Sequence, residues 1–136
     1  MVTGPVLQAK LDLPGSSKNL QSVREVIEST ASEVGFSVDD VRKIVTAAFE
    51  AVANAVTHGS PLESKNTISI TISVYADKLV VEVADQGEGF PLNILKKMPD
   101  TSSPRGRGIP LMYSLVDEVK FENNSGGRVI LTKYRG

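Results

Sequence analysis

Two alternating segments in the middle of the chain constrain its fold more than any other feature. The segment TISITISV (67–74) has an apolar side chain at every second residue, and LVVEVAD (79–85) follows the turn residues Ala76, Asp77 and Lys78. Because successive side chains of a strand point to opposite faces, each segment predicts a strand with one buried face. The short turn predicts that the two strands pair as an antiparallel hairpin.

Two earlier segments carry apolar side chains at helical spacing. The first helix is predicted to begin at Ser16 or Ser17 and to end at Gly35, and the second begins at the capping sequence SVDD (37–40). The two apolar stripes are Leu20, Val23, Ile27, Ala31 and Val34, and then Val41, Ile44, Val45, Ala48, Val52 and Ala55. Each stripe is typical of a helix that packs through one side.

The remaining elements complete a mixed pattern of helices and strands. They are a strand at 6–13, short helices at 91–98 and 108–116, and a final hairpin formed by 118–123 and 128–134. This order predicts an α+β fold, a two-layer sandwich with helices on one face of a mixed, mainly antiparallel sheet. A chain of 136 residues suits one domain, so we expect residues 1–136 to form a single domain.

Composition excludes several classes of function. The absence of cysteine excludes disulfides and thiol catalysis, and a single histidine, His58, excludes a histidine-rich metal site. A net charge of -1 gives no indication of nucleic acid or an anionic membrane as the main partner. The sequence has neither a signal-peptide pattern nor an apolar run long enough for a membrane span. We therefore expect a cytoplasmic protein.

The second predicted helix has an unusual face opposite its apolar stripe. Between Ile44 and His58 the only charged residue is Glu50, whereas a solvated helix face normally carries several charges. One interpretation is that another segment covers this face and that Glu50 pairs with a lysine or arginine. The other is a polar pocket in which Asn54 offers an amide oxygen to Mg²⁺ and Glu50 acts as a base.

A first pair of glycines follows the central hairpin. In VADQGEGF (83–90), Asp85 ends a strand and precedes Gly87 and Gly89. A carboxylate in this position can accept a hydrogen bond from an exocyclic amine, and glycines allow a flat ring to approach the backbone. An ordinary hairpin exit with two glycines would look similar.

A second pair of glycines precedes the helix predicted at 108–116. Gly106 and Gly108 lie where free N–H groups of a helix N-terminus favour phosphate, and Arg105 and Arg107 would add charge-assisted contacts. The alternative is an ordinary glycine cap with solvated arginines. Neither pair of glycines forms a P-loop or a dinucleotide-binding fingerprint.

Taken in order, these motifs resemble the GHKL ATP-binding superfamily: E-x-x-x-N on a helix, D-x-G-x-G after a strand, and G-x-G before a helix. The segments EAVANAVTHG (50–59) and GRGIPLMYSLVDEVKF (106–121) are similar to signatures of its bacterial anti-sigma factor serine kinases, and LTKY (131–134) to their last strand. The resemblance covers nearly the whole chain. It implies a sandwich of the GHKL (Bergerat) ATPase type.

The resemblance also implies roles for individual residues. Glu50 would be the general base for a partner's serine, Asn54 would coordinate Mg²⁺ on the ATP phosphates, and Arg24 would grip a protein partner. Asp85 would bind the adenine amino group. The implied nucleotide contacts further include Gly87 and Gly89 at the adenine, an ATP lid at 91–105, and Gly106, Arg107 and Gly108 at the phosphates, with Arg105 or Arg107 at the γ-phosphate.

The implied function is that of an anti-sigma factor kinase. Such a protein would sequester a sigma factor and use Mg·ATP to phosphorylate a serine of a STAS-type anti-anti-sigma factor, and a homodimer is expected. Two alternatives are a switch kinase that acts on a scaffold protein and a nucleotide-regulated binding module without transferase activity. One departure concerns the sequence Gly126-Gly127-Arg128, where related ATPases have Gly-Thr; Thr132 is an alternative source of the missing threonine contact to adenine.

Overall fold

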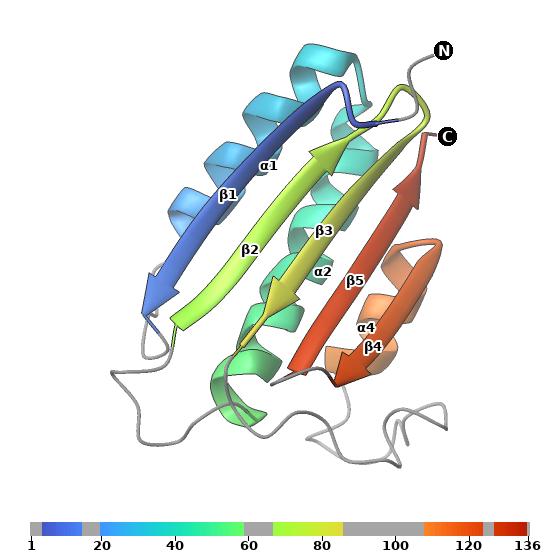
Figure 1. The fold of residues 1–136 in the computed structure, drawn as a ribbon. Helices are drawn as coiled ribbons and strands as arrows, with labels where there is room; N and C mark the ends of the chain where they lie inside the picture. Colours follow the sequence, from blue (N-terminus) through green and yellow to red (C-terminus); the bar gives the residue numbers. More distant parts are fainter. Residues whose placement is uncertain (1–3, 15–19, 59–66, 86–107, 124–126, 136) are drawn as a thin grey trace.

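The computed structural model describes residues 4–14, 20–58, 67–85, 108–123 and 127–135, coloured in Figure 1. These residues form five strands and three helices. In chain order they are β1 (Leu7–Pro14), α1 (Gln21–Val34), α2 (Val38–His58), β2 (Thr67–Val74), β3 (Lys78–Ala84), α4 (Gly108–Leu115), β4 (Glu118–Asn123) and β5 (Gly127–Tyr134). The helix predicted at 91–98 lies outside the described residues.

The strands form one sheet in the order β1-β2-β3-β5-β4. The predicted central hairpin is confirmed, because β2 and β3 pair antiparallel with Ile70 opposite Val83. The final hairpin is confirmed as well, and β5 also pairs antiparallel with β3, so all four pairings between the described strands are antiparallel. The end of β3 therefore lies beside the start of β5.

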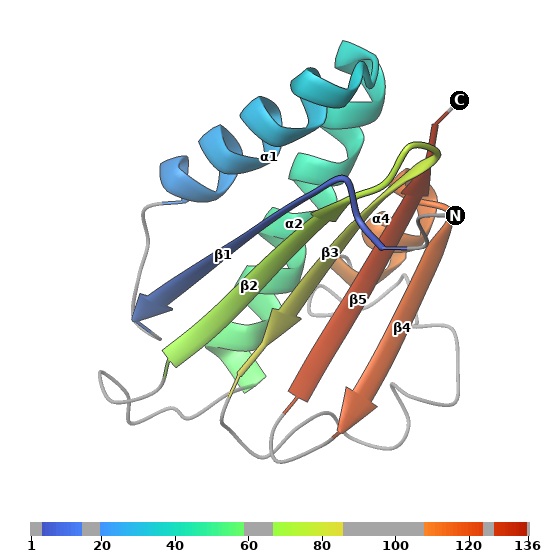
Figure 2. The same cartoon turned by 45° about the horizontal axis from the view of Figure 1, so that its top comes forward.

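The helices cover one face of this sheet, as Figures 1 and 2 show. Alternation in the strands turns one set of side chains towards the helices. The strand side chains that are completely buried there are Ile68, Ile70, Ile72, Val74, Leu79, Val81 and Leu131. The stripes of α1 and α2 complete the core with Val23, Ile27, Ile44 and Ala48. The predicted α+β sandwich, with helices on one face of a mainly antiparallel sheet, is confirmed.

The connection between α1 and α2 follows the predicted capping signals. Gly35 adopts a left-handed conformation with φ 88° and ends α1, and the Ser37 hydroxyl accepts a hydrogen bond of 3.0 Å from the Asp40 N–H at the start of α2. The start of α1 was predicted too early. Leu20 is the N-cap residue and provides no side-chain hydrogen bond, so the helix begins at Gln21 rather than at the two serines.

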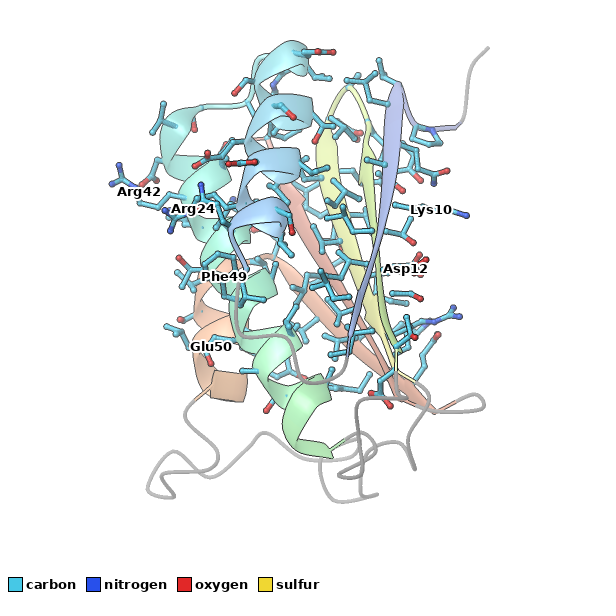
Figure 3. All side chains as sticks on the ribbon, turned by 90° about the vertical axis from the view of Figure 1, so that its left-hand side faces the viewer. Lys10, Asp12, Arg24, Arg42, Phe49 and Glu50 are labelled. Atoms are coloured by element: carbon cyan, nitrogen blue, oxygen red, sulfur yellow. The ribbon has the colours of Figure 1, made fainter. Side chains whose placement is uncertain are left out.

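The opposite face of the sheet is polar. Figure 3 shows Lys10 and Asp12 pointing away from the helices, and the Ser69 hydroxyl donates a hydrogen bond of 2.9 Å to Asp12. Arg128 lies on the same face, 3.8 Å from Glu82 and 3.9 Å from Glu122. The core therefore lies on the face of the sheet that the helices cover, and the candidate site is on that side as well.

None of the helices in the described part of the chain has both the length and the apolar character required to span a bilayer.

Candidate functional site

The ends of two helices and two strands meet at one end of the sandwich, the lower end in Figure 1. They are the last turn of α2, the end of β3, the start of β5 and the start of α4. The predicted site residues of the described chain, Arg24 excepted, come from these elements. The antiparallel pairing of β3 with β5 and the packing of α4 against α2 bring them to this end.

Asn54 is the most informative residue of the site. It lies on α2, its side chain is only 9% exposed, and its amide nitrogen Nδ2 has no hydrogen-bond partner within the described part of the chain. Leaving a buried donor unsatisfied costs about 1–3 kcal/mol, so such a group calls for an explanation. A bound ligand with acceptor oxygens satisfies this donor, and rotation of the amide by a half-turn offers its oxygen to a cation instead.

Glu50 lies one helical turn before Asn54, on the side of α2 away from the sheet (Figure 3). Its side chain is half-buried, and it forms no ion pair with any described lysine or arginine. Between Glu50 and the apolar stripe, Ala47 and Ala51 are completely buried, and α4 packs against α2 with Met112 buried. The covering predicted by the first interpretation is therefore present on one flank, and its predicted pairing of Glu50 is absent among the described residues.

Asp85 is held at the junction of β3 and β5. Its backbone N–H donates to the carbonyl of Gly127 at 2.9 Å, and the Gly127 N–H donates to its carboxylate at 3.4 Å. The carboxylate is buried. The sequence did not predict this partner, because Gly127 lies far away along the chain and carries no side chain that signals a contact.

The proposed substitute for the missing threonine is wrong. Thr132 is paired with Val80 and with Glu118 in the register of the sheet. It lies about 17 Å along β5 from Gly127, since a strand rises about 3.4 Å per residue. Arg128, which stands where relatives are expected to have threonine, contacts acidic side chains on the outer face of the sheet.

The roles predicted for several site residues remain predictions. Gly108 begins α4, in agreement with the predicted helix start. His58 is the last residue of α2, and its side chain is not described. The predicted lid at 91–105 lies outside the described residues, as do Gly87, Gly89, Arg105, Gly106 and Arg107.

Arg24 lies apart from this end of the molecule. It is exposed on α1, and its guanidinium carbon lies 5.5 Å from the centre of the Phe49 ring on α2, a cation–π arrangement. Figure 3 shows both residues in the helical layer, on the side away from the sheet. The guanidinium is therefore available to a protein surface that approaches α1.

A lysine with 12% of its side chain exposed connects three elements behind the site. Lys133 of β5 lies 3.6 Å from Asp40 at the start of α2 and 3.3 Å from Asp117 after α4. The N–H of Tyr134 donates to Asp117 at 2.6 Å, and this bond, with the nearby Lys133 ammonium, lowers the pKa of Asp117. These contacts join the start of α2 to the end of α4. The candidate site lies at the opposite ends of the same two helices. Sequence reasoning missed this network because its members are remote in sequence.

The described residues fit Mg²⁺ bound together with a nucleotide better than a metal held by protein alone. No group of three or more histidine, cysteine, aspartate or glutamate residues in the described part of the chain is placed to hold a metal ion. Magnesium commonly uses one or two protein oxygens and completes its shell with water and phosphate oxygens. The Asn54 amide can supply one such oxygen.

Comparison with known proteins identifies the family. The model of the family described as the histidine kinase-like ATPase domain matches residues 13–133. The serine-protein kinase RsbW of Bacillus velezensis is 34% identical over 92% of this chain and 84% of its own length. RsbW of Bacillus subtilis is 31% identical over the same shares, 92% and 84%.

Solved structures agree on the fold. The RsbU and RsbW domains of a Mycobacterium tuberculosis protein superpose with a TM-score of 0.69 at 23% identity, covering 95% of this chain and 32% of that one. The catalytic domain of the histidine kinase ThkA gives a TM-score of 0.61 at 15% identity, covering 93% and 96%. The resemblance drawn from the three motifs is confirmed. The chain belongs to the histidine kinase-like ATPase family and, within it, to the RsbW serine-protein kinases.

Proposed function

We propose that the protein is a bacterial anti-sigma factor with protein serine kinase activity. It binds Mg·ATP, sequesters a sigma factor, and phosphorylates a serine on a STAS-type anti-anti-sigma factor. The observation that carries this proposal concerns Asn54, which lies one helical turn from Glu50. Its amide nitrogen is buried and has no hydrogen-bond partner among the described residues. Similarity to RsbW kinases supports the same function.

In the proposed reaction, Glu50 is the general base. The partner's serine oxygen attacks the γ-phosphorus of ATP, the bond from that phosphorus to the bridging oxygen of ADP breaks, and the hydroxyl proton passes to the Glu50 carboxylate. Glu50 forms no ion pair with a described lysine or arginine, which suits this role, because a salt bridge would make a carboxylate a weaker base. The half-buried position of Glu50 on α2 leaves it accessible to a partner.

The remaining residues position the nucleotide. Asp85 accepts a hydrogen bond from the adenine amino group, and its own contact with Gly127 fixes the direction of the carboxylate. Asn54 holds Mg²⁺, which neutralises charge on the phosphate oxygens when it is bound. The further nucleotide contacts in this proposal are Gly87, Gly89, Arg105, Gly106, Arg107 and Gly108, with 91–105 as the lid.

The proposed partners are proteins. Arg24 contacts the sigma factor or the anti-anti-sigma factor through a guanidinium exposed on α1. The protein acts in the cytoplasm as a homodimer and binds neither nucleic acid nor a membrane directly. Phosphorylation of the anti-anti-sigma factor detaches it and leaves the kinase free to hold the sigma factor.

Reconstitution with purified partners tests the proposal. The chain is mixed with the sigma factor and the STAS-domain protein of the same genome, and transfer from γ-³²P-ATP is measured with and without magnesium. We expect label on one serine of the STAS protein, together with a complex of the chain and the sigma factor on size exclusion. No sigma complex, together with label on a large scaffold protein added in a parallel reaction, would identify a switch kinase instead. Nucleotide binding without label would leave a binding module.

A further inference from the structure

Lys133 of β5 lies between two acidic side chains that come from different helical segments. Its ammonium group lies 3.6 Å from the Asp40 carboxylate on α2 and donates a hydrogen bond of 3.3 Å to Asp117, the second residue after α4. The side chains of Lys133 and Asp40 are 12% and 9% exposed. One lysine therefore connects the start of α2 to the end of α4.

Asp117 is also bonded to the backbone of β5. Its N–H donates to the Thr132 carbonyl at 2.9 Å, and its carboxylate accepts from the Tyr134 N–H at 2.6 Å. These two bonds hold the end of α4 against the sheet whether or not Lys133 is present. The ammonium group of Lys133 extends the connection to α2 through Asp40.

Stability alone is a weak reason for a contact of this kind. Withdrawing the charges of Lys133 and Asp40 from water offsets much of their attraction, and apolar side chains of similar volume are often as stable as a buried ion pair. A charge between two carboxylates does, however, favour one arrangement of the segments that carry them. The contact is therefore better suited to fixing the position of α4 relative to α2.

The two connected helices carry different parts of the candidate phosphate site. Asn54 lies 14 residues after Asp40, about 21 Å along α2, because an α-helix rises about 1.5 Å per residue. The eight residues of α4 span about 12 Å and begin at Gly108. This helix packs against α2 with Met112 completely buried. A sliding movement at the Lys133 end would therefore change the separation of Asn54 and Gly108.

We propose that Lys133 is a positioning residue for the kinase reaction. By connecting Asp40 to Asp117 it limits how far α4 can slide along α2, and it thereby keeps Asn54 and the first turn of α4 at the separation that the ATP phosphates require. This inference rests on the proposed function, in which Asn54 and Gly108 both serve the phosphates. A misplacement of about 1 Å can lower a reaction rate by about a hundredfold, even when its cause is remote from the chemistry.

The placement of the two helices can be measured without any nucleotide. Because the chain has no cysteine, the substitutions Ala53→Cys on α2 and Leu111→Cys on α4, both at exposed positions, attach spin labels selectively. Electron paramagnetic resonance then gives the distribution of distances between the labels. We expect Lys133→Met to shift or broaden this distribution. The matched control is Lys43→Met, which removes an ion pair of 3.0 Å with Asp39 inside α2 and should leave the distribution unchanged.

Nucleotides with and without the outer phosphates separate positioning from a general loss of structure. AMP tests the adenine side of the site at Asp85, whereas Mg·ATP adds the contacts at Asn54 and α4. We expect Lys133→Met to weaken binding of Mg·ATP by about tenfold and that of AMP by less than about twofold. Isothermal titration measures the first affinity and titration by nuclear magnetic resonance the second. Single-turnover phosphotransfer should slow by about tenfold to a hundredfold.

Two further variants make the outcome decisive. Lys133→Arg keeps a positive charge between the carboxylates and should recover most of the lost affinity for Mg·ATP. Lys133→Met combined with Asp40→Asn and Asp117→Asn leaves no buried charge unpaired, so this triple variant should fold and still show the loss. Equal weakening of AMP and Mg·ATP, an equal effect of Lys43→Met, wild-type behaviour of both Lys133→Met and the triple variant, or failure of the triple variant to fold would overturn the inference.

The wild-type chain separates this inference from the proposed function. A wild type that neither binds Mg·ATP nor transfers phosphate loses the proposed function, whatever the spin labels show. A wild type that does both, while Lys133→Met keeps the same label distances and the same affinities, retains the proposed function and loses only the positioning role of Lys133.

Discussion

Asp85 and Gly127 exchange two hydrogen bonds across the β3–β5 junction. The Asp85 N–H donates to the Gly127 carbonyl at 2.9 Å, and the Gly127 N–H donates to the Asp85 carboxylate at 3.4 Å. An acid at the end of a strand is thereby held in one direction by the backbone of the neighbouring strand. A residue without a side chain thus orients the acid proposed to bind adenine.

Asp85→Asn should reduce the affinity for ATP by about tenfold to a hundredfold, because an amide nitrogen replaces an acceptor beside the adenine amino group. The amide oxygen can still accept from Gly127, so folding should be little affected. Isothermal titration with Mg·ATP measures the change. The exposed acid Asp12, on the opposite face, provides the matched control Asp12→Asn. Unchanged affinity in Asp85→Asn would remove Asp85 from the nucleotide site.

Asn54→Ala should abolish stabilisation by Mg·ATP and leave the free protein nearly as stable as the wild type. The Nδ2 donor has no partner among the described residues, so its removal loses no described hydrogen bond. In the wild type, ligand at a hundredfold excess over its dissociation constant stabilises by about 2.7 kcal/mol. Thermal unfolding with and without ligand measures this difference. Thr46→Ala on the same helix is the control, and retained stabilisation in Asn54→Ala would contradict the assignment.

Glu50→Gln should keep nucleotide binding and lower the rate of phosphotransfer by about 10²- to 10⁴-fold, the usual contribution of a general base. The substitution preserves shape and removes the basic carboxylate. Single-turnover transfer of ³²P to the partner measures the rate. Glu33→Gln, at an exposed position of α1, should transfer at the wild-type rate. If both variants behave alike, another group acts as the base.

Asp117 should make stability depend on pH in acid. The Tyr134 N–H and then Lys133 lower its pKa from the ordinary value of 3.8, so folding is favoured when the carboxylate is charged. This contribution is fully present above pH 3.8 and is lost as the pH falls through the lower pKa of the folded state. Urea unfolding of wild type and Asp117→Asn should therefore differ near neutral pH and converge in strong acid. A difference that stays constant would exclude this linkage.

Gly35→Ala should destabilise the fold by about 1–2 kcal/mol, because a left-handed conformation is unfavourable for a residue with a Cβ. Gly35 has φ 88°, and an added Cβ would lie 2.9 Å from the Arg135 guanidinium. Urea unfolding measures the loss. Gly4→Ala, where an added Cβ meets no atom within 4 Å, should be neutral. Equal stability of the two variants would show that the turn relaxes without cost.

Local patterns predicted most of the fold. The alternation of apolar residues in β2 and β3 and the apolar stripe of α2 were sufficient to predict these elements. Each element buries one face, so its apolar residues recur with the period of a strand or a helix. The cap at Ser37 and the helix end at Gly35 were also predicted, because each depends on only a few neighbouring residues. The start of α1 was not, because Leu20 provides no side-chain cap and the serines before it were misleading.

Contacts between residues that are distant in the sequence could not be predicted from local patterns. Asn54 and Glu50 were found because they share one helix. By contrast, the pairing of Lys133 with Asp40 depends on β5 lying beside β3 under α2, which no local period encodes.

The inner position of β5 has a consequence for synthesis of the protein. Although β5 follows the other four described strands in the chain, it lies between β3 and β4 in the sheet. Until β5 has been synthesised and has left the exit tunnel, β3 presents an unpaired edge, and unpaired edges promote aggregation of nascent chains. Chaperones that shield this edge during translation would therefore raise the yield of folded kinase.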